Sequence, residues 1–397
     1  MRKLAVLAFA LASLASCKKD TTTTAPITPV TTPTVTPSGG TYTTMHNFND
    51  TLGGNPTGDL VLYNGLLYGV TQSDGLNYFG NIFSISTSGS YTNLYTFTGI
   101  NSPTGSGPVG DLLVYNNLLY GMAEQGGTGN GGVIFTINPT THAYTVVANF
   151  GTGSNNGNYP ESGLIVSSTG IMYGTTESGG TTGNGNVFSF NPAGNVYTDL
   201  HDFSLGGGIN PISSLTLSAS GTVLYGTTTL GGPDNGGTVY AVNTDGTGFT
   251  TLVNFGGIKG ESADGRLLLI GNTLYGMNNQ GGNNADSMGT IYSVNTDGSG
   301  FATLLSFNLT NGANPCGALI VNGSTLYGLA TGGGTIGGTL FSIGTGGSGM
   351  DVLVNFGVNT ITGSFPHGSL LLDSGVLYGM TDGGGKYSYG TIFSYKL

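Results

Sequence analysis

The sequence predicts an all-β protein, a seven-bladed β-propeller in which an N-terminal strand completes the last blade. Three observations lead to this prediction. The 397 residues include 75 glycines and only 7% charged residues, a composition that favours short strands and turns over helices. A unit marked by the triplet Leu/Met-Tyr-Gly recurs seven times from residue 41 onward. The seventh unit lacks its last strand, and a matching strand precedes the first unit.

Residues 1–16 have the pattern of a signal peptide and are kept out of the fold. Arg2 and Lys3 precede an apolar stretch from Leu4 to Leu14, and Leu14-Ala15-Ser16-Cys17 resembles the bacterial lipobox. We expect cleavage before Cys17, lipidation of its thiol, and attachment of the exported protein to the membrane of the bacterial cell envelope, with the outer membrane as the expected site. The alternative is an ordinary secretory signal followed by an incidental cysteine.

Residues 17–40 are expected to form a linker between this anchor and the folded domain. The stretch from Thr21 to Pro37 contains four prolines and nine threonines. Such a sequence has too few apolar residues to form a core and favours an extended, polyproline-like chain. The propeller domain is therefore expected to span residues 41–397.

The first two strands of each unit carry the clearest motifs. A Pro-x-Gly/Ser-x-Leu motif, for example Pro56 to Leu60 and Pro108 to Leu112, is assigned to strand a, with Ala263 in place of proline in the fifth unit. Strand b contains the Leu/Met-Tyr-Gly triplet. The spacing between its tyrosines is 50 to 53 residues, and they lie at Tyr68, Tyr120, Tyr173, Tyr225, Tyr275, Tyr327 and Tyr378.

Strands c and d complete the unit and explain how the array closes. Strand c, Gly-x-(Ile/Val/Leu)-(Phe/Tyr), occurs seven times, from Phe83 to Phe393, whereas strand d with its terminal Phe follows only six of these copies. The stretch Tyr42 to Phe48 has the strand d pattern and lies before the first strand a. Pairing it with the last strand c would close a ring of four-stranded blades and remove the exposed sheet edges. A parallel β-helix is the alternative, but its coils are shorter than this repeat.

The repeated motifs resemble the GloVer tandem repeat of exported bacterial proteins, and the strand layout is similar to that of kelch propellers. The resemblance covers residues 41–397 and implies an extracytoplasmic repeat protein, without an established activity or catalytic residues. The chain lacks tryptophan and has phenylalanine where a kelch blade ends in Trp, so no kelch partner is implied.

Composition argues against several functions. From residue 41 onward four basic residues stand against 18 acidic ones, and such a charge would repel nucleic acid. We expect no cofactor and no metal site, because His46 and His201 fall on outer strands of different blades, His142 in a strand c to d turn and His367 before the last strand a. Asp245 and Asp297 are expected in Asp-Gly turns and not in calcium loops.

The connections from strand d to strand a and from b to c emerge on one face, and loops are where function tends to lie. Five carboxylates are expected on this face of blades one to three and are the candidate ligand-binding residues: Asp59, Asp111, Glu124, Glu161 and Glu177. We expect a monomeric, non-catalytic binding module for a glycan or an envelope protein. A carbohydrate-active enzyme of the glycoside hydrolase or polysaccharide lyase type, using these acids, is the alternative. A structural surface protein is a further alternative.

Overall fold

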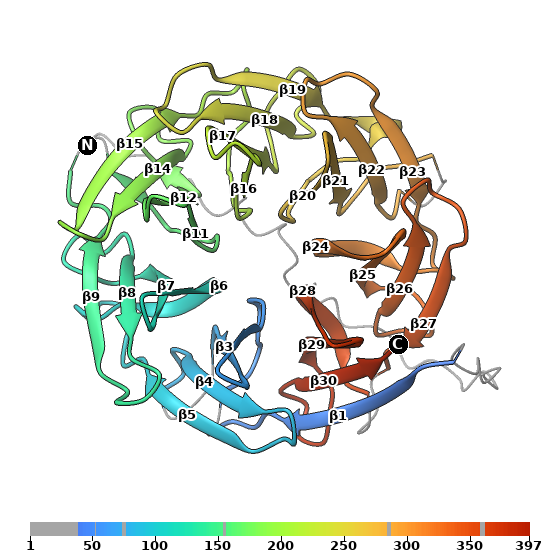
Figure 1. Cartoon of the computed structure of the whole chain (residues 1–397), viewed down its shortest axis with the longest axis horizontal. Coiled ribbons are helices and arrows are strands. Elements are labelled where there is room, and N and C mark those ends of the chain that lie inside the picture. Colours follow the sequence, from blue (N-terminus) through green and yellow to red (C-terminus); the bar gives the residue numbers. More distant parts are fainter. Residues whose placement is uncertain (1–38, 52, 74–76, 154–155, 284–286, 358–361) are drawn as a thin grey trace, which may run out of the picture.

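The computed structural model describes residues 39–51, 53–73, 77–153, 156–283, 287–357 and 362–397. Seven four-stranded antiparallel sheets stand around a central axis (Figure 1), so the predicted seven-bladed propeller is confirmed. The expected signal peptide, residues 1–16, and Cys17 lie outside the described residues, as does the linker up to residue 38. No helix in the described part of the chain is long and apolar enough to cross a membrane.

Each blade is a meander whose innermost strand is a and whose outermost strand is d. The first four blades are β2 (Val61–Tyr63), β3 (Leu66–Thr71), β4 (Asn81–Ser86) and β5 (Tyr91–Thr96); β6 (Ser106–Tyr115), β7 (Leu118–Gln125), β8 (Val133–Ile137) and β9 (Tyr144–Asn149); β11 (Ile165–Val166), β12 (Met172–Thr176), β14 (Asn186–Asn191) and β15 (Val196–Asp202); β16 (Thr216–Leu217), β17 (Val223–Thr228), β18 (Thr238–Asn243) and β19 (Thr250–Asn254).

The other three blades follow the same order. They are β20 (Leu268–Ile270), β21 (Thr273–Asn278), β22 (Thr290–Asn295) and β23 (Ala302–Ser306); β24 (Ala313–Asn322), β25 (Thr325–Gly332), β26 (Thr339–Gly344) and β27 (Asp351–Asn355); β28 (Ser364–Asp373), β29 (Val376–Gly383), β30 (Thr391–Lys396) and β1 (Thr41–Asn47). A short pair, β10 (Gly157–Asn158) with β13 (Ser178–Gly179), and the 3-10 helix η1 (Gly257–Lys259) lie in connecting loops.

The ring closes as the sequence predicts. Strand β1 pairs antiparallel with β30, with Tyr42 opposite Tyr395 and His46 opposite Ile392, and the two strands lie side by side in Figure 1. Phe48, which follows β1, is fully buried in a cluster that includes Phe83 of blade one. The N-terminal strand therefore closes both the last sheet and the interface between blades seven and one.

Both faces of each sheet are covered by the neighbouring blades, so consecutive residues of strand b are buried in pairs. Leu67 and Tyr68 point to opposite faces and are 0% and 3% exposed. The glycine that follows them is required by close packing, because a Cβ at Gly69 would lie 2.7 Å from the ring of Phe83. The same close contact with the strand c ring occurs in the other six blades, which explains why the triplet ends in glycine in every blade.

The outer strands are joined across blades by stacked rings. Tyr95 of blade one stacks on Tyr144 of blade two with ring centroids 4.0 Å apart, and His201 stacks on Phe249 at 3.8 Å. His46 stacks on Tyr91 at 4.3 Å, and burial lowers the pKa of His46 to about 4. The two histidines thus pack between blades as uncharged rings at neutral pH, on outer strands as predicted.

The structure corrects one assignment. The Pro-x-Gly/Ser-x-Leu motif is not strand a itself in most blades, because in blades one, three, four and five the strand begins only after the leucine. In β6 the motif interrupts the ladder, since the register shifts between Val109 and Leu113, and Gly110 adopts a φ of 68° that favours glycine. The motif is thus an arch that precedes or interrupts the strand and turns side chains towards the axis.

Candidate functional site

The seven arches meet at the axis and line a cavity of about 400 Å³. All seven motifs contribute their second and third residues to its wall. The second residues are Thr57, Val109, Glu161, Ile212, Asp264, Cys316 and His367. Ends of loops and of strand b add Asn55, Gln72 and Asp382, which places the cavity mouth on the face that carries the d to a and b to c connections.

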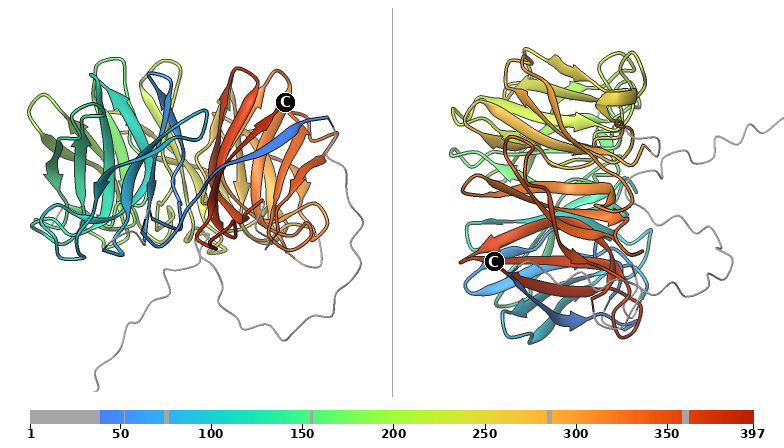
Figure 2. Two further views of the ribbon diagram at one scale, coloured as in Figure 1. Left: turned by 90° about the horizontal axis from the view of Figure 1, so that it is seen from below. Right: turned by 90° about the vertical axis from the view of Figure 1, so that its right-hand side faces the viewer.

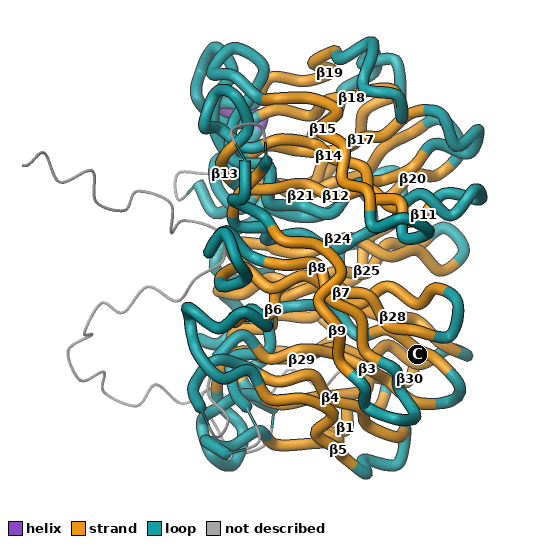
Figure 3. Tube along the Cα trace, turned by 90° about the vertical axis from the view of Figure 1, so that its left-hand side faces the viewer, coloured by secondary structure: helices purple, strands orange, loops and turns teal. Residues whose placement is uncertain are grey.

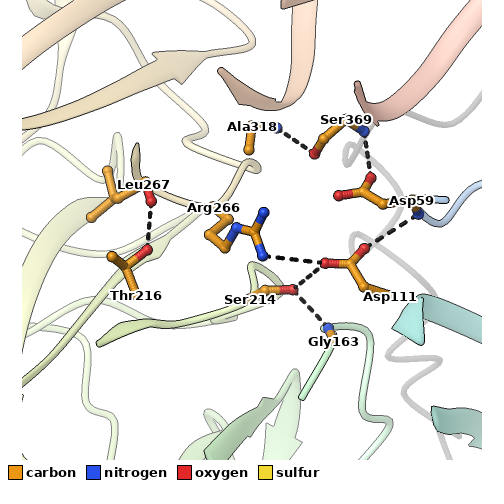
Figure 4. Close-up of polar contacts among 9 residues, drawn as sticks. All are labelled: Asp59, Asp111, Gly163, Ser214, Thr216, Arg266, Leu267, Ala318 and Ser369. Atoms are coloured by element: carbon orange, nitrogen blue, oxygen red, sulfur yellow. Dashed lines mark hydrogen bonds and ion pairs between the residues drawn. The ribbon is translucent and has the colours of Figure 1, made fainter. Parts of the chain in front are cut away.

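The fourth residues of the motifs form a second ring, here called the axial ring. Its members are Asp59, Asp111, Gly163, Ser214, Arg266, Ala318 and Ser369 (Figure 4). Where this position holds Asp or Ser, the side chain accepts a hydrogen bond from the backbone N–H of the preceding blade. The Gly163 N–H donates to Ser214 Oγ at 2.8 Å, and the Ala318 N–H donates to Ser369 Oγ at 2.7 Å.

The same hydrogen bond joins the two ends of the ring. The N–H of Ser369 in blade seven donates to the carboxylate of Asp59 in blade one. The N–H of Asp59 in turn donates to Asp111 Oδ1 at 3.2 Å. Asp59 therefore links blades seven, one and two, and part of its role is structural.

Asp111 has the most unusual environment of the predicted site residues. Ser214 Oγ donates to its Oδ2 at 3.4 Å, and Arg266 Nη1 lies 3.8 Å from the same oxygen. The Asp111 side chain is 21% exposed and the Arg266 side chain 40%. Burial raises the pKa of Asp111 and the neighbouring Asp59 carboxylate raises it further, while Arg266 opposes both effects. Asp111 thus retains its proton to a higher pH than an ordinary aspartic acid.

The structure brings three of the five predicted carboxylates together at the cavity. Asp59, Asp111 and Glu161 line it. Glu124 and Glu177 do not: they lie at the ends of strands b of blades two and three. Gln72 Nε2 donates to Glu124 Oε2 at 2.9 Å, and Asn210 Nδ2 donates to Glu177 Oε1 at 3.4 Å.

Three charged residues and one histidine of the wall were missed by sequence reasoning. They are Asp264, Arg266, His367 and Asp382. His367 was expected before the last strand a but lies within β28, at its arch. The signal was present: Asp264 and His367 occupy the second motif position, which lines the cavity in every blade, and Arg266 occupies the fourth, which lines it in five. Asp382 matches Glu124 and Glu177, four residues after the tyrosine of its triplet.

Asp245 and Asp297 have the predicted turn role, on the opposite face. Asp245 Oδ1 accepts hydrogen bonds from the N–H and hydroxyl of Thr247 at 2.9 and 2.7 Å. Asp297 Oδ1 accepts the same pair from Ser299 at 2.9 and 2.6 Å. These bonds lower the pKa of both aspartates. Each carboxylate therefore makes hydrogen bonds within its own turn.

The chemistry of the cavity is that of hydrogen bonding and charge. Five carboxylates, one guanidinium and one imidazole lie in its wall, among hydroxyl, amide and backbone groups. Within the described residues, no three or more His, Cys, Asp or Glu side chains are grouped closely enough to hold a metal ion. The wall can accept hydrogen bonds from hydroxyl or ammonium groups, and Asp111 can hold or release a proton.

Two oligogalacturonate lyases among the solved structures share this fold at low sequence identity. An oligogalacturonate lyase from Vibrio parahaemolyticus aligns over 89% of this chain and 93% of its own, with 12% identity and a TM-score of 0.54. An oligogalacturonate lyase in complex with manganese aligns over 91% and 92%, with 13% identity and a TM-score of 0.53. The tricorn protease aligns over 76% of this chain, which spans only 26% of that protein, with 11% identity and a TM-score of 0.44.

These likenesses concern the fold alone, and no curated protein matches the sequence. The family comparison is more specific. The Gloeobacter/Verrucomicrobia repeat matches residues 31–171, 152–335 and 271–397, overlapping segments that together span the whole propeller. The chain therefore belongs to the Gloeobacter/Verrucomicrobia repeat family, as the motifs in its sequence indicated.

Proposed function

We propose that this protein is a non-catalytic binding module of the bacterial cell envelope that takes part of a glycan or protein ligand into its central cavity. The observation that carries the proposal is the acidic wall of that cavity. Asp59, Asp111 and Glu161 from three blades meet there, although the chain as a whole has only 7% charged residues. Ligand sites typically combine a concave shape with a few convergent polar groups.

The location is part of the same proposal. A signal peptide over residues 1–16, lipidation of Cys17 and a linker up to residue 40 would hold the monomeric propeller at the membrane, with the outer membrane as the expected site. The linker would join the propeller at Thr41, where β1 begins. No nucleic acid and no cofactor is proposed.

A carbohydrate-active enzyme is the second candidate, and one observation favours it. Asp111 holds its proton to an elevated pH beside Asp59, and a carboxylic acid paired with a carboxylate is the arrangement used in glycoside hydrolysis. The hydrogen bond that the Asp59 carboxylate accepts from the Ser369 N–H of blade seven favours the binding role, because it fixes this carboxylate as part of the ring. A purely structural surface protein is the remaining alternative.

The test uses soluble residues 41–397, which contain all seven blades and the closing strand. This protein would be applied to an array of glycans and envelope proteins. For any hit, Asp111→Asn together with Glu161→Gln is expected to weaken binding at least tenfold without lowering the melting temperature. Glu124→Gln with Glu177→Gln tests the two carboxylates outside the wall.

The control is Asp245→Asn with Asp297→Asn on the opposite face, which should bind like the parent. Equal loss in this control, or undiminished affinity in the cavity variant, would contradict a site at the axis. Conversion of a bound glycan into products would favour the enzyme instead, and the absence of any hit would favour a structural protein.

A further inference from the structure

Large exposed apolar side chains gather on one face of the propeller. Of the ten in the described part of the chain, eight lie in d to a or b to c connections. Five are in d to a connections: Ile100, Tyr159, Leu205, Ile258 and Leu309. Three are in b to c connections: Tyr78, Ile336 and Tyr387. We call these eight residues the apolar rim. Val196 and Leu397, the other two, are at the opposite face.

The rim surrounds the cavity mouth, because its residues come from connections all around the ring. These connections gather at the left-hand face in Figure 3, where η1 and β13 lie, whereas the C-terminus lies towards the other face. Several rim side chains are prominently exposed, with Leu205 at 67% and Ile258 at 69%. Scattered exposed apolar residues are ordinary on a protein surface, but here eight of the ten lie on the face that carries the acidic cavity.

A second hollow adds to this face. It has a volume of about 460 Å³. Three glycines and the polar residues Gln280, Ser287 and Asn314 line it together with Ile258, Met288 and the acid Glu261. The Gly257 N–H donates to Glu261 Oε1 at 3.0 Å, which fixes the carboxylate at the edge of the hollow. A pocket of this composition can accept an apolar side chain beside a basic one, as anchor pockets of protein interfaces do.

We infer that this face docks a protein partner that places basic side chains in the acidic cavity and apolar side chains against the rim. The inference rests on the proposed function, since it names the class of ligand that the cavity receives. Charge complementarity supports it: the wall is acidic, and from residue 41 onward the chain has 18 acids and four bases. Interfaces of this kind combine an apolar contact area with complementary charge.

Three other occupants fit the same face less well. A second copy of the chain would bring two acidic cavities together, and like charges repel. β1 begins at the face opposite the d to a and b to c connections, as the left view of Figure 2 shows. The proposed tether therefore leaves from the face away from the rim and does not by itself bring the rim to a membrane. A glycan alone would not use the rim, since five of its eight side chains are aliphatic and offer no ring for a sugar to stack on.

The test is selection from a phage-displayed library of random 16-residue peptides against biotinylated residues 41–397. The inference predicts enriched peptides that combine Lys or Arg with Leu, Ile or Phe. Their binding should weaken at least tenfold between 0.05 and 0.5 M salt, on the order expected when opposite charges attract across an interface. Enrichment of acidic or uncharged peptides, or none, would overturn the inference.

Two variants locate the binding of an enriched synthetic peptide. Leu205→Asn with Leu309→Asn changes the rim, and at least a tenfold loss of affinity is expected. Val196→Asn is the matched control, because Val196 is 53% exposed and Leu309 is 54% exposed, and it should bind like the parent. Undiminished affinity in the rim variant would overturn the inference.

The remaining outcomes separate this inference from the proposed function. Loss of peptide binding in Asp111→Asn with Glu161→Gln but not in the rim variant would leave the cavity function standing and remove the rim. Loss of peptide binding in the rim variant alone would leave the rim as the docking surface and remove the cavity as the binding site. Rim-dependent binding to phosphatidylcholine or phosphatidylglycerol vesicles, or a rim-dependent dimer in sedimentation equilibrium, would identify a membrane or a second copy and overturn the protein partner.

Discussion

Two tyrosines in the core should be replaceable by phenylalanine with a gain in stability. Strand c ends its motif with Phe in five blades and with Tyr240 and Tyr292 in blades four and five. Both tyrosines are fully buried, and no described residue hydrogen-bonds to either hydroxyl. Each hydroxyl lies against the glycine of the Leu-Tyr-Gly triplet, where a Cβ on Gly226 or Gly276 would overlap it. Burial accordingly raises the pKa of both tyrosines.

The size of the effect follows from the unpaired hydroxyl. A buried polar group without a partner costs about 1–3 kcal/mol relative to the same shape without it. Tyr240→Phe should therefore raise the free energy of unfolding by about that amount. Unfolding entropy of about 2.1 cal/mol/K per residue over about 360 residues gives about 0.75 kcal/mol/K, so the melting temperature should rise by roughly 1–4 °C. Tyr292→Phe should add to this gain, because the two tyrosines belong to different core clusters.

The assay is thermal denaturation followed by circular dichroism, with urea unfolding as a second measure. Phe188→Tyr is the matched control, because Phe188 is fully buried at the same position of blade three. This change should destabilise the protein by a similar amount. Lower stability of Tyr240→Phe would refute the reasoning and would mean that the hydroxyl has a partner, such as a buried water.

The other predictions concern closure, titration and anchoring. Deleting Gly40 to Asp50 removes β1 and Phe48, so stability should fall by more than about 3 kcal/mol; a truncated protein that stays monomeric and as stable as the parent would contradict the shared blade. The raised pKa of Asp111 means that its carboxyl group binds a proton more tightly in the folded protein than in the unfolded chain. Ionisation of Asp111 therefore lowers the free energy of unfolding as the pH rises above 3.8, the ordinary pKa of an aspartic acid. In urea unfolding between about pH 4 and 8, the stability of Asp111→Asn relative to the parent should increase with pH, and a pH-independent difference would count against the raised pKa. Cys17→Ser should release the protein from the membrane fraction, and unchanged partitioning would show that Cys17 is not the anchor.

The fold could be predicted from the repeat, whereas the register of strand a could not. The number of blades follows from the number of repeats, and ring closure follows from the strand d pattern that precedes the first repeat. Both features can be recognised in short stretches of the sequence. The arch at Gly110 depends on a register shift within β6 and on its packing in the ring, where a Cβ on Gly110 would overlap Ser162 of the next blade. Such contacts between units cannot be derived from one unit alone.

The site was predictable in part, for the same reason. Residue type and loop position selected Asp59, Asp111 and Glu161, which line the cavity, but gave equal weight to Glu124 and Glu177, which lie outside its wall. Ring closure decides which residues meet: Ser369 and Asp59 are 310 positions apart and hydrogen-bonded. Aligning the motifs by position, instead of judging residues by type, would have placed Arg266 at the axis from sequence.

The axial ring also shows why its aspartates are better explained by function than by stability. Ser214 and Ser369 make the same hydrogen bond to the preceding blade that Asp59 and Asp111 make. Serine would do so without placing two carboxylates side by side, an arrangement that raises the pKa of Asp111. Local arrangements that are less favourable than an available alternative are typical of functional sites. The hydrogen bonds therefore explain why a polar residue is present at these two positions, but not why it is charged, and the ligand binding proposed above supplies a reason for the charge.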